Sequence, residues 1–379
     1  MRILHVLDAS ANWQHRVALT QLLDKLPEND VRPHVASIDP RPNTVIRQLP
    51  ATTIEIAPRR LGLGALAAPA LRRLCGREGV DIVHAWGADA AAAARAARPD
   101  GPLVLTVFDP GVSPRDVRVI RTVAQDHPFA VACTSQRVRR RLVEQGVPLD
   151  RCAVIRPAVD FAAISRDRKS LTRRQLELPD DALVVIAPEP ETHRDAYGQL
   201  SVLWSVLVRS HLPGPVRLIV SGCGQVQTRV SRLARCSEHP ECLRATADRY
   251  RFEQLLTVAN YLVIGATGDL PTTAIAWAMA AGVPVIAPAD YSVAEMLADG
   301  LNAILFKAPH RWTQTGLQLC KLYNKPRDLT RITEVARSQA YEVFGLHRCI
   351  RQHVQLYENL LADRAPGDAI SDPATWAPA

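Results

Sequence analysis

The sequence has no long apolar run and no closely spaced pair of cysteines. No stretch approaches the ~20 consecutive apolar residues that a membrane-spanning helix needs. The start, Met1 to Leu7, is too short and too soon polar for a secretory signal. The eight cysteines are scattered and form no Cys-x-x-Cys motif. These absences predict a cytoplasmic protein whose thiols are free and mostly buried.

A metal site and a nucleic-acid interface are also not indicated. Cys236 and Cys242 are the closest cysteines, with His239 between them, but further ligands at suitable spacing are missing. Aromatic residues make up only 5% of the chain, and no basic stretch is interleaved with them. We therefore expect no bound metal and no nucleic-acid partner.

What the sequence does have is an excess of arginine, with a formal net charge of +8. Such a balance favours anionic partners such as nucleotides or phospholipid surfaces. The densest cluster lies in a predicted helix and consists of Arg137, Arg139, Arg140 and Arg141. It is either a solvated helix face or a contact for anionic lipid or a phosphate-bearing ligand. Peripheral contact with the inner face of a membrane therefore stays open.

The length of 379 residues allows two domains. Short apolar runs alternate with helical patterns, which predicts parallel α/β sheets. Strands are expected at 3–7, 34–38, 82–84, 103–107, 130–134, 152–155, 183–187, 216–221, 261–264 and 283–287. Helices are expected at 16–26, 66–78, 88–97, 135–146, 195–210, 226–236, 252–259 and 272–281.

The pattern restarts after a charged region near residues 164–181. We therefore predict two Rossmann-like domains, 1–165 and 166–346, that face each other across a cleft. A helix at 347–362 follows, and the tail 363–379, rich in Ala, Pro and Asp, is expected to be disordered. Ligands of open parallel sheets bind beyond the carboxyl ends of the strands, which predicts a site in that cleft.

Four motifs occur in an informative order. They are Val159-Asp160, the Gly222-Cys-Gly224 turn, the run Ala-Met-Ala-Ala-Gly-Val-Pro-Val at 278–285, and the segment 292–306. Together they resemble GT-B glycosyltransferases of the retaining family 4, or group 1, type. The resemblance covers about residues 1–362 and is strongest from 271 to 306. It implies a GT-B fold in which the helix at 347–362 crosses back to the first domain.

The resemblance also implies a function. The second domain would bind a nucleotide-sugar donor such as a UDP- or GDP-sugar, and the first would face a glycan or lipid-linked acceptor. No metal or resident cofactor would be needed, because cations and helix dipoles hold the diphosphate. The implied donor-binding residues are Arg194, Gly222, Gly224, Pro271, Thr272, Thr273, Trp277 and Glu295. The implied catalytic residues are Asp269, His84 and Asp109, and Trp13, His15 and Arg16 lie on the acceptor side.

The chain departs from the family pattern at several of these positions. The second family glutamate is replaced by Trp277, and the first falls at Gly268 or Asp269. The indole of Trp277 cannot accept a hydrogen bond from ribose, so this side chain either stacks on a ligand or packs in a core. Glu189 stands near the position of the family arginine, while Arg194 fits that of the lysine.

The first domain departs as well. Residues 11–16 replace the usual Gly-Gly loop, and Phe108 stands where a histidine is common. His84 either faces a ligand or is a satisfied structural histidine. Two hypotheses follow: a glycosyltransferase with an altered active site, or a non-catalytic GT-B protein that binds a sugar, a nucleotide or a partner subunit.

Overall fold

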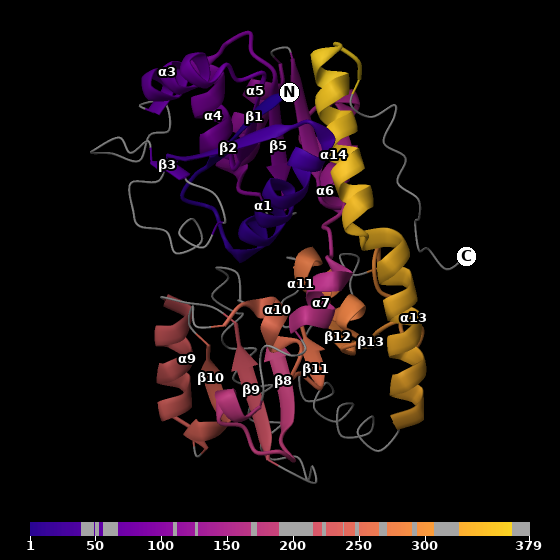
Figure 1. Ribbon diagram of the computed structural model, residues 1–379. Helices are drawn as coiled ribbons and strands as arrows, with labels where there is room; N and C mark the ends of the chain where they lie inside the picture. The colour runs from indigo at the N-terminus through magenta and orange to yellow at the C-terminus, as the bar shows by residue number, and fades with distance from the viewer. Residues whose placement is uncertain are drawn as a thin grey trace. The chain divides into compact units, whose positions relative to one another are not determined.

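The chain folds into two compact units in a computed structural model (Figure 1). The first comprises Met1–Ala158 and the helix that begins at Leu346, and the second comprises Val159–Gly345. The residues described are 1–38, 49, 53–55, 67–108, 112–125, 128–167, 173–188, 215–221, 225–237, 239–246, 250–264, 271–289, 294–306 and 326–365.

The first unit is built on a parallel sheet with the strand order β3-β2-β1-β4-β5-β6-β7. Its strands are β1 (Arg2–Leu7), β2 (Arg32–Ser37), β3 (Thr53–Glu55), β4 (Ile82–Trp86), β5 (Leu103–Val107), β6 (Phe129–Cys133) and β7 (Cys152–Val154). The helices are α1 (Trp13–Lys25), α3 (Ala68–Glu78), α4 (Ala88–Ala97), α5 (Pro114–Ala124), α6 (Gln136–Glu144) and α14 (Leu346–Leu361), with 3-10 turns at Leu26–Asn29 and Leu149–Arg151.

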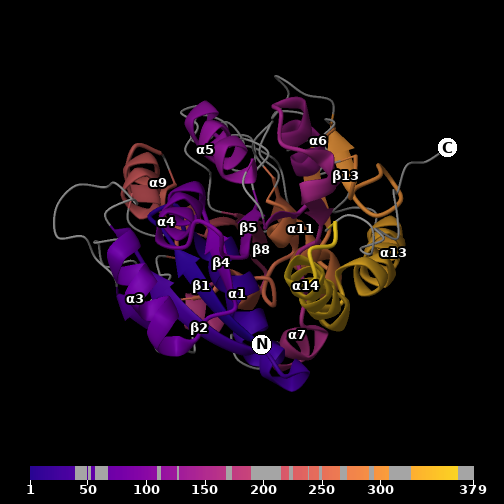
Figure 2. The ribbon, with the colours of Figure 1, turned by 90° about the horizontal axis from the view of Figure 1, so that it is seen from above.

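Helices cover both faces of this sheet, which explains why β4, β5 and β6 are buried along their whole length and are mostly apolar. One core layer joins the sheet to α3, α4, α5 and α6. The other joins it to α1 and α14 (Figure 2). The first unit is thus completed by a helix that follows the whole second unit in sequence.

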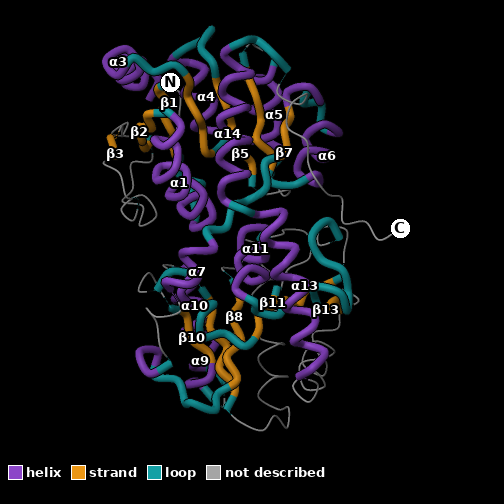
Figure 3. The backbone as a smooth tube through the Cα atoms, turned by 45° about the vertical axis from the view of Figure 1, so that its right-hand side comes forward, coloured by secondary structure: helices purple, strands orange, loops and turns teal. Residues whose placement is uncertain are grey.

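The second unit contains a parallel sheet with the order β10-β9-β8-β11-β12-β13. The strands are β8 (Leu183–Ala187), β9 (Val216–Val220), β10 (Leu243–Ala245), β11 (Tyr261–Val263), β12 (Val285–Pro288) and β13 (Ile304–Phe306). The helices are α7 (Phe161–Asp167), α9 (Gln225–Arg235), α10 (Phe252–Leu255), α11 (Thr272–Ala281) and α13 (Pro326–Phe344), with 3-10 turns at Arg174–Leu176 and Pro240–Cys242. Figure 3 shows these strands in orange, with helices beside them.

The chain passes between the units twice, after Ala158 and after Gly345. The two crossing segments pair with each other in parallel, at Val159 and Gly345. The Val159 N–H donates to the Phe344 carbonyl at 2.7 Å. Phe161 also packs edge-on against Tyr341, with ring centroids 5.3 Å apart. The second unit therefore begins and ends at neighbouring points of its own surface.

The predicted fold class of two parallel Rossmann-like sheets is confirmed. The helix expected at 252–259 ends at Leu255, and the strand expected at 283–287 begins only at Val285. Gly282 ends α11 with φ of 71°, and Pro284 follows before the strand begins. The helix expected at 195–210 and the tail from 366 lie outside the described residues. No described helix is long and apolar enough to cross a membrane.

Candidate functional site

A buried acid stands at the carboxyl end of β1 in the first unit. The Asp8 carboxylate accepts hydrogen bonds from the Ser10 N–H at 2.9 Å, the Ser10 hydroxyl at 2.5 Å and the Ala90 N–H at 3.0 Å. Gly87 is the N-cap of α4 with φ of 143°, and a β-carbon there would overlap this carboxylate. Burial raises the pKa of Asp8, and the hydrogen bonds from Ser10 and Ala90 oppose the shift.

Asp8 therefore occupies the N-terminus of α4, a position that could otherwise hold a phosphate. The N-terminus of α1 is also occupied by the chain itself. The Asn12 carboxamide oxygen accepts from the Gln14 and His15 N–H groups, and His15 Nδ1 accepts from the Asn12 N–H at 3.2 Å. These reciprocal bonds form a capping box where the family has its glycine pair.

The three residues predicted on the acceptor side lie in this first turn of α1. Trp13 is partly exposed, whereas His15 and Arg16 are buried. The His15 ring packs against Phe108 and Trp86, with centroid distances of 4.7 and 6.2 Å. Trp13 thus has the accessible side chain, and His15 serves to cap α1 and fill the core.

His84 is fully buried, and both of its ring nitrogens are engaged. Nδ1 lies 2.7 Å from the Tyr357 hydroxyl of α14, and Nε2 lies 2.7 Å from the Thr106 hydroxyl of β5. The ring stacks on Trp86 with centroids 4.7 Å apart. Of the two interpretations of His84, this geometry favours the structural one, because no ring atom is available to a ligand.

Three further histidines are buried in the same region. His5 lies 5.1 Å from His84 between ring centroids, and its Nδ1 accepts from the indole N–H of Trp86 at 3.1 Å. His353 contacts the Cys349 carbonyl through Nδ1 at 2.9 Å. Burial lowers the pKa of His5 to about 3 and those of His15 and His353 to about 4. Burial also holds the pKa of His84 well below its usual value. The cluster is therefore neutral at physiological pH.

The adjoining cavity is too small for a sugar. It lies between the sheet and the helices α1 and α14, and its volume is about 20 Å³. Gln21, Thr106, Phe108, Thr134 and His353 contribute to its lining. A volume of this size holds about one water molecule. The interior of the first unit is thus packed around its histidines rather than open to substrate.

The second unit offers a different environment at α11. Its N-cap, Pro271, supplies no side-chain hydrogen bond. The N–H groups of Thr272, Thr273 and Ala274 have no acceptor among the residues described. The hydroxyls of Thr272 and Thr273 are buried and likewise find no partner there. Buried polar groups usually have a partner, so these donors are available to a bound group.

The rest of α11 is buried in the second unit. The helix is buried from Thr272 to Ala280 and packs against α7 and α13. Trp277 is 4% exposed, and its indole N–H has no partner among the described residues. The packing interpretation of Trp277 is therefore favoured over stacking on a ligand. Glu295 is half-buried and follows β12.

Five of the predicted residues cannot be placed. Asp269, Asp109, Arg194, Gly222 and Gly224 lie outside the described residues. Within the described part of the chain, no group of three or more His, Cys, Asp or Glu side chains could hold a metal ion. Asp8 was not predicted, although an acid directly after the first strand was a usable signal.

Comparison with known proteins identifies the fold and finds a family match for part of the chain. Residues 16–163 match the model of the family described as Glycosyltransferase Family 4. A comparison with curated protein sequences finds no match.

Solved structures match over almost the whole chain. The structure of HepE from Anabaena in complex with UDP and glucose is 19% identical, with a TM-score of 0.74 over 95% of this chain and 100% of that one. Sucrose-phosphate synthase from Thermosynechococcus elongatus is 16% identical, with a TM-score of 0.75 over 96% and 100%. A putative UDP-N-acetylglucosamine 2-epimerase from Listeria monocytogenes is 11% identical, with a TM-score of 0.67 over 98% and 99%.

At these identities the solved structures establish the fold, and the family model adds the sequence match of the first unit. The GT-B fold that the sequence motifs implied is confirmed. The chain has the GT-B fold of two Rossmann-like domains, and its residues 16–163 match Glycosyltransferase Family 4.

Proposed function

We propose that the protein is a retaining glycosyltransferase that moves a sugar from a nucleotide-diphosphate donor to a glycan or lipid-linked acceptor. The uncapped N-terminus of α11 carries the proposal. Its first N–H groups, which have no acceptor in the described part of the chain, and the positive end of the helix dipole suit a diphosphate. The match to Glycosyltransferase Family 4 and the UDP in the Anabaena HepE structure support a nucleotide sugar as the donor.

The chemistry that α11 can supply is electrostatic. As the glycosidic bond breaks, negative charge grows on the leaving diphosphate. Fixed N–H and hydroxyl donors stabilise this charge without having to reorganise at the moment of reaction. The hydroxyls of Thr272 and Thr273 can donate to phosphate oxygens because no described residue accepts from them. The helix thus holds the leaving group.

Three residues complete the proposed site on the basis of their sequence positions. Arg194 holds the diphosphate bidentately, as a guanidinium can. Asp269, shortly before α11, lies beside the transferred sugar, and Asp109 borders the acceptor. The glycines of the Gly222–Gly224 turn let the backbone approach the donor. We also propose a cytoplasmic location with peripheral contact to an anionic membrane, which the net charge of +8 supports.

A non-catalytic GT-B protein is the second candidate. The observation in its favour is Trp277, which stands in place of a family glutamate and is 4% exposed. A buried indole supplies neither the carboxylate nor a stacking face. The His84 ring, enclosed by Thr106 and Tyr357, adds to this argument. Such a protein would bind a nucleotide or a sugar without transferring it.

The two candidates are separated by calorimetric titration with a panel of UDP- and GDP-sugars, followed by donor hydrolysis and an acceptor screen. We expect binding that weakens about fivefold in Thr273→Val, because one hydrogen bond contributes roughly 1 kcal/mol. Thr20→Val is the matched control, since the Thr20 hydroxyl is also buried with no partner among the described residues but lies on α1 of the first unit.

The outcomes are distinct. No binding at millimolar nucleotide would end the glycosyltransferase proposal. Binding without turnover in any acceptor screen would favour the non-catalytic protein. An Arg194→Ala variant that binds as well as the wild type would remove Arg194 from the donor site.

A further inference from the structure

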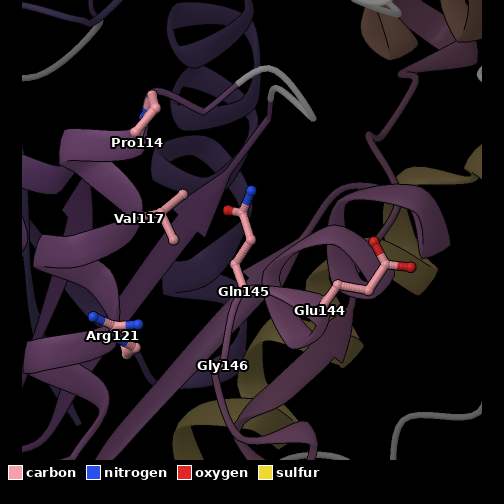
Figure 4. A pocket seen from close by; sticks show the side chains of 6 residues that line it. All are labelled: Pro114, Val117, Arg121, Glu144, Gln145 and Gly146. Atoms are coloured by element: carbon pink, nitrogen blue, oxygen red, sulfur yellow. The ribbon is translucent and has the colours of Figure 1, made fainter.

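A surface groove lies between α5 and the end of α6 in the first unit (Figure 4). Its volume is about 540 Å³, within the range of pockets that bind small ligands. Six residues line it: Pro114, Val117, Arg121, Glu144, Gln145 and Gly146. All of them belong to the first unit, whereas α11 belongs to the second.

The two helices that form the groove are strongly basic. They carry seven arginines and two acidic residues. Arg115 is paired with Asp89 at 3.0 Å. Arg121, in the groove itself, is exposed and has no hydrogen bond or ion pair with any described residue. An unpaired guanidinium in a concave site favours a carboxylate or phosphate ligand.

An unsatisfied acceptor lies beside this cation. The carboxamide oxygen of Gln145 is buried and has no partner among the described residues. Gln145 lines the groove, so a rotation of its carboxamide would let a ligand hydroxyl supply the missing donor. In Figure 4 the Gln145 side chain lies between α5 and the end of α6, whereas the Glu144 carboxylate points away from α5. Glu144, the acidic residue of the lining, is therefore turned away from Arg121 on α5.

The backbone at Gly146 keeps room for Arg121. Gly146 has φ of 90°, a conformation that other residues rarely adopt. A β-carbon there would lie 3.3 Å from Arg121 Cδ. Pro114 and Val117 add apolar surface along the same side of α5. The groove thus combines one cation, one hydrogen-bond acceptor that lacks a donor among the described residues, and a small apolar surface.

From this combination we infer that the α5–α6 groove binds a saccharide that carries a negative charge. A uronic acid residue has a carboxylate for Arg121, hydroxyls for Gln145 and C–H faces for Pro114. A bilayer surface fits less well, because the site is concave and neither α5 nor α6 exposes a large hydrophobic side chain among the residues described. The inference does not depend on catalysis.

Titration of the full-length protein with oligogalacturonate, without nucleotide, tests the proposal. We expect saturable binding, and no binding of a neutral maltooligosaccharide of the same length. Arg121→Gln is expected to weaken oligogalacturonate binding about tenfold, because hydrogen bonds to charged groups are worth more than neutral ones. Gln145→Ala is expected to weaken it about threefold through loss of one neutral hydrogen bond.

Arg115→Gln is the matched control, because it removes the same charge from the same helix outside the groove. An effect of less than twofold is expected there. Equal losses in Arg121→Gln and Arg115→Gln would mean unspecific attraction of a polyanion and would overturn the proposal. So would binding to phosphatidylglycerol vesicles without binding to oligogalacturonate. Circular dichroism of each variant checks that it has folded.

Discussion

At the scale of single residues, the first unit depends on polar side chains whose partners lie far away in sequence. Asp8 holds the N-terminus of α4, and Tyr357 hydrogen-bonds a histidine 273 positions earlier. A sequence pattern cannot reveal such pairs, because each residue alone suits either a site or a core. His84 is the clearest case, since its strand-end position fitted a ligand-facing histidine equally well.

Replacement of Gly87 by alanine tests the contact with Asp8. A β-carbon at this position overlaps the buried carboxylate, and φ of 143° is unfavourable for alanine. We expect Gly87→Ala to lower the free energy of unfolding by about 3 kcal/mol, from backbone strain and disturbed hydrogen bonds. Urea denaturation measures the change.

Gly76→Ala is the control for this substitution. Gly76 lies inside α3, and nothing is within 4 Å of its added β-carbon. Alanine there is expected to raise the free energy of unfolding by about 0.5–1 kcal/mol, as in other helix interiors. A Gly87→Ala variant as stable as the wild type would show that the contact of Asp8 with the start of α4 does not contribute to stability.

At the scale of elements, the helices and strands with clear local signals could be predicted. The strands 103–107 and 183–187 and the helices 88–97 and 272–281 have the bounds expected from their apolar patterns and glycine stops. The short strands β3, β10 and β13 and the helices α5, α7 and α13 were not predicted. Three-residue strands carry too little alternation to be recognised, and their partners in the sheet decide them.

Helix α14 is held by the buried histidines, and this makes its attachment sensitive to acid. His353 has its pKa lowered from 6.5 to about 4 by burial. Between these values the unfolded chain binds more protons than the folded one, so the free energy of unfolding falls as the pH falls. Each such histidine lowers the free energy of unfolding by about 1.4 kcal/mol for each pH unit between these two values. Above pH 6.5 the ring is neutral in both states, so it contributes no pH dependence there.

We therefore expect His353→Gln to flatten the pH dependence of unfolding between about pH 6.5 and pH 4 by that slope. Urea denaturation across this window, followed through tryptophan fluorescence, provides the measurement. His347→Gln, an exposed position on the same helix, serves as the control and should keep the slope of the wild type. An unchanged slope in His353→Gln would contradict the assignment of a neutral buried ring.

At the scale of the whole molecule, the two units differ in their continuity. The second is one uninterrupted segment, Val159–Gly345, whereas the first needs α14 from beyond it. The core of the first unit includes Leu356, Tyr357 and Leu360 of that helix. Recognition of the GT-B motifs predicted the two sheets and the return of the last helix to the first domain. The individual contacts of α14, such as that of Tyr357 with His84, could only be seen in the folded chain.

Expression of fragments tests this difference. We expect residues 159–345 to fold alone with cooperative thermal unfolding, because their core and sheet are complete. Residues 1–158 are expected to remain unfolded or aggregate, because the layer that α14 covers is exposed. Addition of a peptide spanning 346–365 should restore their structure, as followed by circular dichroism. A stable 1–158 fragment would show that α14 is dispensable.

The position of α14 also sets an order of events on the ribosome. Synthesis proceeds from the N-terminus, and leading domains generally fold first. Here the leading domain lacks one of its layers until the last part of the chain emerges, so the second domain is complete first. In the nascent first domain, the apolar layer that α14 covers therefore stays exposed while residues 159–345 are translated.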